Sequence, residues 1–280
     1  MIDLYKRAMN LETPPPAKSV KGFFTDTSLC IGCKACEVAC KQWNQLPADG
    51  YRLSGDSYDN TGSFSATTWR HVAFVEQAKA NGRREEQRWL MMSDVCKHCA
   101  NAACLEACPT GSLVRTEYGT VYVQQDICNG CGFCVPACPF GVIDRTPKHG
   151  TFEAGTAHKC TLCYDRLRDD MTPACAKSCP TASIQFGDVD ELRERARRRL
   201  GELRARGETG AQLYGMPDSQ EATEVGPLHA FFLLLDKPQV YNLPEVPRLP
   251  RKSMAERYAW SGVVAVGAAV ISALVFGRRG

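Results

Sequence analysis

The sequence predicts an α+β fold with an N-terminal arm at residues 1–22, a cysteine-rich region at residues 23–189, an extended arm at residues 207–257 and one C-terminal transmembrane helix at residues 258–277. Three observations support this prediction. The 280 residues include 16 cysteines in four regular groups, short strand-like segments separate these groups, and a long uncharged run lies near the C-terminus. A composition of 44% hydrophobic and 23% charged residues is typical of folded proteins and excludes disorder as the main state. Because the formal net charge is only +3, no nucleic acid is expected as a partner.

The cysteines follow one another in four groups of four. The groups are Cys30, Cys33, Cys36 and Cys40; Cys96, Cys99, Cys104 and Cys108; Cys128, Cys131, Cys134 and Cys138; and Cys160, Cys163, Cys175 and Cys179. Groups one and three have the spacing C-x2-C-x2-C-x3-C of bacterial ferredoxins, in which three thiolates of one loop bind one iron-sulfur cluster and the fourth binds its neighbour. A proline follows the last cysteine of groups two, three and four, as it does in the ferredoxin motif. The spacing therefore predicts four 4Fe-4S clusters, each with four thiolates.

Disulfide bonds and structural zinc are the two alternatives for so many cysteines. A disulfide framework needs an oxidising compartment, and residues 1–18 show neither the apolar segment of a signal peptide nor a twin arginine. Export, if it occurs, is expected to depend on a partner that carries the signal. Zinc sites use two C-x2-C pairs, whereas three cysteines at successive x2 intervals leave one thiolate unused. Only the fourth group, with its looser spacing C-x2-C-x11-C-x3-C, leaves zinc open as an alternative.

The position of the fourth ligand predicts which thiols share a cluster. Groups two and three flank a candidate hairpin at residues 112–123 and form one two-cluster unit at residues 93–145, so each group supplies the fourth ligand of the other. By exclusion and pseudo-symmetry, the outer groups pair in the same way. The predicted ligand sets are quartet a, Cys30, Cys33, Cys36 and Cys179; quartet b, Cys160, Cys163, Cys175 and Cys40; quartet c, Cys96, Cys99, Cys104 and Cys138; and quartet d, Cys128, Cys131, Cys134 and Cys108.

These assignments use all sixteen thiolates, which leaves no open coordination position for a substrate. Four clusters in one polypeptide favour electron transfer, and the sequence contains no phosphate-binding glycine loop, nucleophile elbow or acid-base constellation. No metal or haem is assigned to the five histidines, His71, His98, His149, His158 and His229. The alternative from a different class is a regulatory protein whose clusters sense redox state.

The segments around the cysteine groups carry weaker signals. Residues 41–95 form an insertion with strand-like stretches at 68–77 and 88–95, which could be a docking surface or a two-stranded cover for a cluster. Residues 190–206 predict a helix with a narrow apolar stripe and many arginines, suited to anionic lipid, an acidic partner or simply solvent. Residues 207–257 include three prolines between 240 and 250, and are expected to form an extended arm or linker.

The final segment predicts a membrane anchor. Residues 258–277 carry no charge over twenty positions, a length that fits one transmembrane helix better than the alternative, a buried core helix. Ala265, Ala269 and Ala273 form a small-residue ridge suited to packing on another membrane helix. The lipid bilayer of the inner cell membrane is therefore an expected partner. Basic residues at both ends leave the orientation undetermined.

Three motifs carry a family resemblance: CIGCKACEVACKQWN from Cys30, CKHCANAACLEACPTGSL from Cys96 and CNGCGFCVPACPFGV from Cys128. With the single C-terminal anchor, they resemble the iron-sulfur (beta) subunit of membrane-bound respiratory formate dehydrogenases. Related subunits serve dimethyl sulfoxide, polysulfide, thiosulfate and nitrate reductases and some nickel-iron hydrogenases, and an equivalent role there is the alternative. The continuation Trp43-Asn44 favours formate.

The resemblance implies two pseudo-symmetric ferredoxin-like domains that each hold two 4Fe-4S clusters, with the family's ligands falling on the sixteen cysteines already named. It also implies a catalytic subunit with a molybdenum or tungsten bis-pterin cofactor, and a membrane cytochrome b-type subunit that delivers the electrons to quinone. The resemblance does not decide which side of the membrane the soluble part faces.

Overall fold

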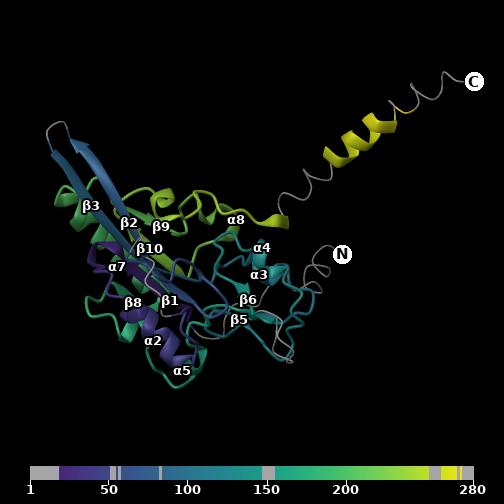
Figure 1. Cartoon of the computed structure of the whole chain (residues 1–280), viewed down its shortest axis with the longest axis horizontal. Helices are drawn as coiled ribbons and strands as arrows, with labels where there is room; N and C mark the ends of the chain where they lie inside the picture. The colour runs from purple at the N-terminus through teal and green to yellow at the C-terminus, as the bar shows by residue number, and fades with distance from the viewer. Residues whose placement is uncertain are drawn as a thin grey trace, which may run out of the picture. The chain divides into compact units, whose positions relative to one another are not determined.

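The computed structural model describes residues 19–50, 55, 58–81, 84–146, 155–251, 260–269 and 272. The protein divides into two compact units, Met1–Pro247 and Arg248–Gly280. The first is a mixed α/β unit (Figure 1). Of the expected N-terminal arm at residues 1–22, residues 1–18 lie outside the described part, and its last two residues begin the first strand.

A four-stranded sheet forms the centre of the first unit. Its strands, in spatial order, are β8 (Ile184–Asp188), β1 (Lys21–Asp26), β10 (Ala230–Leu234) and β9 (Gln212–Tyr214). β1 and β10 are parallel, and the two outer pairs are antiparallel. All of β10 is buried, and the rings of Phe24 and Phe231 stack across the parallel pair with 5.6 Å between centroids. The sheet therefore joins the segment before the first cysteine group to segments after the last one.

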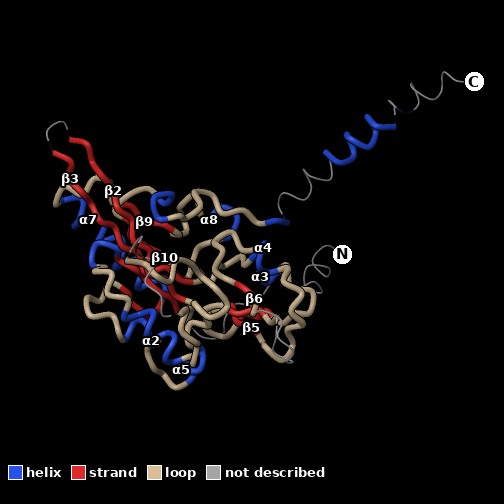
Figure 2. The backbone as a smooth tube through the Cα atoms, viewed as in Figure 1, coloured by secondary structure: helices blue, strands red, loops and turns tan. Residues whose placement is uncertain are grey.

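Short helices and loops carry the cysteines or lie directly beside them. The helices are η1 (Thr27–Leu29), α2 (Ala35–Trp43), α3 (Ala103–Glu106), α4 (Cys134–Ala137), α5 (Tyr164–Arg168) and α6 (Ala174–Lys177). Two small antiparallel hairpins lie between them, β4 (Leu113–Arg115) with β5 (Val121–Val123), and β6 (Asp144–Arg145) with β7 (Ala157–His158). α2 contacts α6, and α3 contacts α4. Figure 2 shows α3 and α4 well apart from α2 and α5, so the helices at the cysteine groups form two clusters of elements.

The insertion is built on a long hairpin, β2 (Arg70–Asn81) with β3 (Arg84–Val95), paired in register from Arg70 opposite Val95 (Figure 1). The strand-like stretches predicted at residues 68–77 and 88–95 lie in or beside these strands. Val72, Leu90, Met92 and Val95 are buried at the base of the hairpin. Because β3 runs directly into Cys96, the hairpin fixes the start of the second cysteine group.

The helix expected at residues 190–206 is confirmed as α7 (Val189–Ala205), which buries Leu192, Ala196 and Leu203 on one face. The extended arm expected at residues 207–257 is wrong over residues 207–247. This segment contains β9, β10, α8 (Ala222–Val225) and η2 (Pro238–Tyr241). The error has a physical reason, because a strand buried on both faces has no alternating pattern, and Pro238 begins a 3-10 helix instead of keeping the backbone extended.

The C-terminal unit is described over part of the predicted span. Residues 260–269 are helical and exposed, including Trp260, Val263, Val264 and Val266. Residue 272 is also helical. Residues 258–259, 270–271 and 273–277 of the predicted span lie outside the described residues. Within the part of the protein that the structure describes, we find no helix with the length and apolar character needed to span a bilayer.

Gly22 in β1 allows two neighbouring segments to approach the central sheet. A Cβ at this position would lie 1.9 Å from the carbonyl oxygen of His229 and 2.7 Å from Cγ2 of Val189. We therefore expect Gly22→Ala to lower the free energy of unfolding by about 2–3 kcal/mol through overpacking. A denaturant titration measures this. The matched control is Gly201→Ala on α7, where a Cβ meets nothing within 4 Å, and where we expect a gain of about 0.5–1 kcal/mol. Equal effects of the two changes would contradict the prediction.

Candidate iron-sulfur cluster sites

The structure brings the four thiols of quartet a together around one pocket. Cys30 and Cys33 lie in the loop between η1 and α2, Cys36 lies in the first turn of α2, and Cys179 follows α6. All four line a pocket of about 300 Å³, together with Ile31, Val72 and Ile184 among others. Gly32 makes this loop possible, because its φ of 66° is the left-handed conformation and a Cβ there would lie 2.6 Å from the Phe74 ring.

Quartet c surrounds a second pocket of about 350 Å³. Its lining includes Cys96, Cys99, Cys104 and Cys138, with apolar side chains such as Val121, Val142 and Ile143. Cys138 comes from the third cysteine group, so two groups meet at this pocket. The neighbouring His98 is fully buried, its Nδ1 accepts the Val121 N–H at 3.1 Å, and its Nε2 has no partner among the described residues. Because Nδ1 accepts a hydrogen bond, Nε2 carries the ring proton, and this N–H is available as a donor beside quartet c.

Within quartet b, and likewise within quartet d, the thiols lie close enough together to influence one another's ionisation. Burial, followed by the charge of Cys175, raises the pKa of Cys40 and that of Cys163 to about 12. Burial also raises the pKa of Cys134 to about 11, and the charges that add to this effect come from Cys128, Cys108 and Cys131. The charges of Cys40, Cys175 and Cys163 likewise add to the effect of burial on the pKa of Cys160. Each of these two sets therefore gathers three thiols of one group with one thiol of its partner group.

The four quartets follow one another in space. Cys36 of quartet a interacts with Cys175 of quartet b, and Cys160 of quartet b interacts with Cys96 of quartet c. Cys104 of quartet c then interacts with Cys134 of quartet d. Only Cys33 and Cys131 are exposed among the sixteen thiols, and they belong to quartets a and d. The spatial order is thus a, b, c, d, with an exposed thiol in the quartet at each end.

Positive charges are buried between these thiols. Arg70, Lys97 and Lys159 are each exposed by 2% or less. Lys97 forms an ion pair with Asp94, but Arg70 and Lys159 form none with a carboxylate of the described residues. Burial alone would lower the pKa of Lys159, yet the charges of Cys96, Cys104 and Cys160 raise it. These buried cations fit a site that carries several thiolates.

Other donors are aimed at individual sulfur atoms. The Leu162 N–H lies 3.3 Å from Cys160 Sγ, and the Ala157 N–H lies 3.4 Å from Cys128 Sγ. Burial opposes ionisation of Cys108, but the hydroxyls of Ser112 and Thr110 lower its pKa to about 7. Hydrogen bonds of this kind stabilise thiolates and tune bound clusters.

Of the two residues that favour formate in the sequence, Trp43 connects α2 to α5 and Asn44 contacts Cys40 within α2. Trp43 Nε1 donates to Asp165 at 2.7 Å, and the guanidinium of Arg166 lies 4.1 Å above the Trp43 ring. Asn44 Nδ2 donates to the Cys40 carbonyl oxygen at 2.8 Å and lies 3.6 Å from Cys40 Sγ. These contacts hold Cys40 next to the elements that carry the rest of quartet b.

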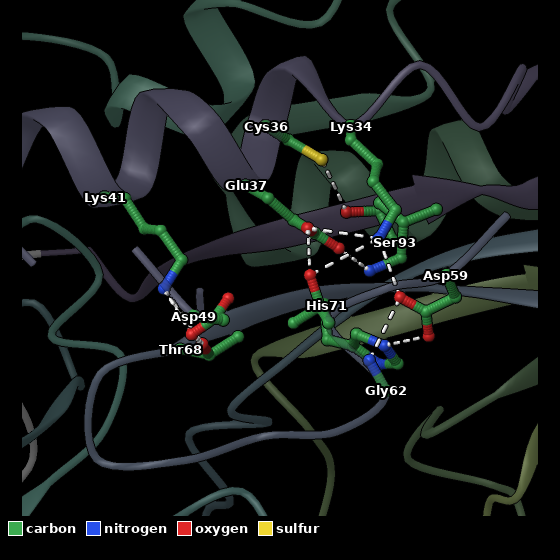
Figure 3. A network of polar contacts seen from close by, with 12 residues as sticks. Lys34, Cys36, Glu37, Lys41, Asp49, Asp59, Gly62, Thr68, His71 and Ser93 are labelled. Carbon is green, nitrogen blue, oxygen red and sulfur yellow. Dashed lines mark hydrogen bonds and ion pairs between the residues drawn. The ribbon is translucent and has the colours of Figure 1, made fainter. Parts of the chain in front are cut away.

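A network of polar contacts fastens the insertion to α2, as Figure 3 shows. Lys34 donates to Asp59 at 2.7 Å, and His71 Nε2 bonds the second oxygen of Asp59 at 2.6 Å. The buried Glu37 accepts the Val72 N–H. Lys41 forms a separate ion pair with Asp49 at 2.8 Å. Of the two interpretations of the insertion, these contacts favour a cover over the cluster-bearing helix.

Asp59 is central to this network. Burial opposes its ionisation, but the Lys34 ammonium and the Gly62 N–H lower its pKa below the usual value. Because the folded state favours the carboxylate, the contribution of Asp59 is present at neutral pH and is lost as the pH falls below about 4. We expect Asp59→Asn to weaken attachment of residues 58–68 by about 1–3 kcal/mol, measured as faster limited proteolysis of this loop.

The control for this change is Asp218→Asn. Asp218 forms an exposed ion pair with Arg197 at 3.8 Å, and such pairs contribute little to stability. Its cleavage pattern should match that of the unchanged protein. Equal protection of residues 58–68 from proteolysis in the Asp59 and Asp218 variants would contradict the proposed role of Asp59 in attaching this loop.

Comparisons with known proteins agree with this cysteine architecture. Two family models described as 4Fe-4S dicluster domain match residues 29–112 and 87–189. The protein is 39% identical over 228 residues to the formate dehydrogenase iron-sulfur subunit of Haemophilus influenzae, covering 80% of this sequence and 68% of the relative. It is 37% identical over 284 residues to the nitrate-inducible formate dehydrogenase iron-sulfur subunit of Escherichia coli, covering 98% of this sequence and 91% of the relative.

The protein belongs to the family of formate dehydrogenase iron-sulfur subunits. A further relative, the B subunit of the anaerobic dimethyl sulfoxide reductase of Escherichia coli, is 35% identical over 182 residues, covering 62% of this sequence and 76% of that subunit. The two dicluster domains and the sixteen cysteines fit four 4Fe-4S clusters, as in the formate dehydrogenase subunits. This family membership makes the protein an electron-transfer subunit.

Sequence reasoning missed the residues that surround the thiols. Arg70, Ser93 and Asp59 gave no signal, because none of them belongs to a cysteine motif. Lys97 and Lys159 offered a usable signal, since each directly follows or precedes a cysteine, Cys96 or Cys160.

Proposed function

We propose that this protein conducts electrons through four 4Fe-4S clusters bound by quartets a, b, c and d, in that order. The observation that carries the proposal is the spatial order of the quartets, with an exposed thiol in each terminal quartet and predominantly buried thiols between. Such an arrangement allows electrons to enter at one end and leave at the other, while inner clusters stay shielded from water. Each cluster accepts and releases one electron.

The partner at one end is proposed to be the catalytic subunit of a formate dehydrogenase, with a molybdenum or tungsten bis-pterin cofactor. Close similarity to iron-sulfur subunits of formate dehydrogenase supports this choice, and the use of all sixteen thiols as cluster ligands leaves no substrate site among them. The partner at the other end is proposed to be a membrane cytochrome b-type subunit that passes electrons to quinone.

Residues 258–277 are proposed to cross the inner cell membrane as a single helix. Support comes from the uncharged run of twenty residues and from the exposed apolar side chains of the described helical segment, among them Trp260, Val263 and Val266. A variant truncated after Arg251 should be released from membranes by alkaline carbonate if this helix is the anchor. Retention of the truncated complex to the same extent as the complete one would refute the anchor.

The decisive experiment uses the complex purified anaerobically with its own partners. Analysis should give about sixteen iron and about sixteen acid-labile sulfide per copy of this subunit. Formate should then bleach the visible absorbance of the clusters and generate electron paramagnetic resonance signals from several spin-coupled centres. A preparation dominated by zinc, or clusters that formate does not reduce, would overturn the proposal.

A second candidate is the equivalent subunit of a dimethyl sulfoxide reductase, favoured by the 35% identity to the B subunit of that enzyme. The same preparation separates the two. If dimethyl sulfoxide reoxidises the reduced clusters and formate has no effect, the catalytic partner is a sulfoxide reductase.

A further inference from the structure

Arg70 is a buried cation without an ordinary partner. It is the first residue of β2, its side chain is among the largest that are fully buried, and it is 1% exposed. Its Nη1 donates to Ser93 Oγ at 2.9 Å, whereas Nε and Nη2 have no partner among the described residues. In this part of the protein Arg70 also forms no ion pair with Asp or Glu. Since arginine stays protonated in proteins, this position carries a permanent positive charge.

The surroundings of this charge are thiols from two quartets. The four thiols that act on it most strongly are Cys175, Cys36, Cys160 and Cys40, one from quartet a and three from quartet b. The guanidinium also lies 4.9 Å from the centre of the Phe23 ring, which closes one side of it to water. Arg70 therefore lies at the junction between the two quartets.

Ser93 connects this cation to quartet a. Because a guanidinium can only donate, the Ser93 hydroxyl oxygen accepts from Arg70, and its own proton is free for Cys36 Sγ, which lies 3.1 Å away (Figure 3). Ser93 is 1% exposed, so no solvent competes for this proton. The result is a directed chain of hydrogen bonds from Arg70 through Ser93 to Cys36.

A buried guanidinium without a carboxylate is costly and requires compensation. The compensation present in this structure is thiolate charge. When a cluster takes up one electron, its negative charge increases by one while no protein bond forms or breaks and the guanidinium keeps its proton. A neighbouring positive charge therefore stabilises the reduced state more than the oxidised state.

We infer that Arg70 sets the reduction potentials of the two clusters bound by quartets a and b together, by its charge for both and additionally through the Ser93 hydroxyl for a. The inference rests on the proposed quartets. It assigns Arg70 and Ser93 a positioning and tuning role, since neither replaces a thiol as a ligand. The unpaired Nε–H and Nη2–H groups are available as donors to cluster sulfur, whether of the cysteines or of inorganic sulfide.

The test is a redox titration of the intact complex, followed by electron paramagnetic resonance. Signals are first assigned with one substitution per quartet, such as Cys33→Ser for a and Cys163→Ser for b. Arg70→Met should lower the potentials of a and b relative to c and d. We expect the equilibrium constant for electron exchange between the two pairs to change at least tenfold, which corresponds to about 59 mV for one electron.

Ser93→Ala provides an independent second variant. It should lower the potential of quartet a alone and leave quartet b unchanged, because only Cys36 receives the Ser93 proton. Arg197→Gln is the control, since this exposed arginine of α7 pairs with the exposed Asp218 at 3.8 Å, and it should leave all four potentials unchanged. Arg70→Lys keeps the charge and should stay closer to the unchanged protein than Arg70→Met.

The outcomes separate the two proposals. Four normally loaded clusters with unchanged potentials of a and b in Arg70→Met would overturn the role of Arg70 and leave the proposed function intact. If the Arg70→Met variant does not bind its clusters, the redox titrations of Arg70→Lys and Ser93→Ala test the inference instead. An unchanged potential of the quartet a cluster in Ser93→Ala would then overturn it. Signals that do not follow the one-per-quartet substitutions would instead count against the proposed quartets.

Discussion

Removing quartet b should stop electrons from crossing the protein from one end to the other. In a Cys163→Ala variant, iron should fall from about sixteen to about twelve atoms per subunit, because one 4Fe-4S cluster is lost. Quinone reduction by formate should fall to background, since quartets a and c are then separated by the empty place of b. Formate oxidation with an artificial acceptor at the catalytic partner should continue.

This variant also reports the direction of electron flow. Formate should reduce the clusters only on the side of quartet b that faces the catalytic partner. The protein should remain folded, because the negative charge of Cys36 remains next to Arg70, and the negative charges of Cys96 and Cys104 remain next to Lys159. Quinone reduction that persists at more than a small fraction of the original rate, with quartet b verifiably absent, would contradict the linear order.

Local spacing was sufficient for the parts of the site that depend on neighbouring residues. A C-x2-C-x2-C loop can place three thiols around one centre with no information from the rest of the fold, and the hairpin β4–β5 needs only the residues around its own turn. The amphipathic helix α7 was predictable for the same reason, because its buried residues recur at helical spacing.

The central sheet was not predictable in this way. β1 pairs with β10 across about two hundred residues of sequence, and neither strand alternates between apolar and polar residues in a form that reveals its partner. The sequence pattern therefore predicts an arm at residues 207–257, although residues 207–247 supply two strands of the sheet. The insertion was harder still, since its attachment depends on single ion pairs such as Lys34 with Asp59.

The buried cations are the most informative failure of sequence reasoning. Arginine and lysine are normally assigned to the surface, and Arg70 lies in a strand-like segment that gave no reason for an exception. Its burial becomes understandable only when the thiols of two quartets are placed around it. The electrostatics of the site thus belong to the tertiary structure and to the clusters together.

Removing the clusters should unfold the first unit. Burial raises the pKa of Cys36, a neighbour of Arg70, to about 11, and it also raises the pKa values of Cys104 and Cys160, neighbours of Lys159, so these thiols take up protons at neutral pH once the iron is gone. Arg70 and Lys159 then lose the negative charges that surround them. Leaving a buried charge without its partner costs about 3–5 kcal/mol, and two such sites approach the whole stability of a typical domain, about 5–15 kcal/mol.

We therefore expect the protein, after anaerobic chelation of its iron, to lose its near-ultraviolet circular dichroism and its cooperative thermal transition. The matched variant is Arg70→Met combined with Lys159→Met, which removes both cations while keeping apolar side chains in their place. Its cluster-free form should retain more protected backbone amides in hydrogen exchange than the cluster-free unchanged protein. This comparison separates the loss of counter-charge from the loss of the cross-links that the clusters provide, because only the first is relieved by the double variant. A cluster-free unchanged protein that melts cooperatively within a few degrees of the loaded form would show that its fold does not depend on the clusters.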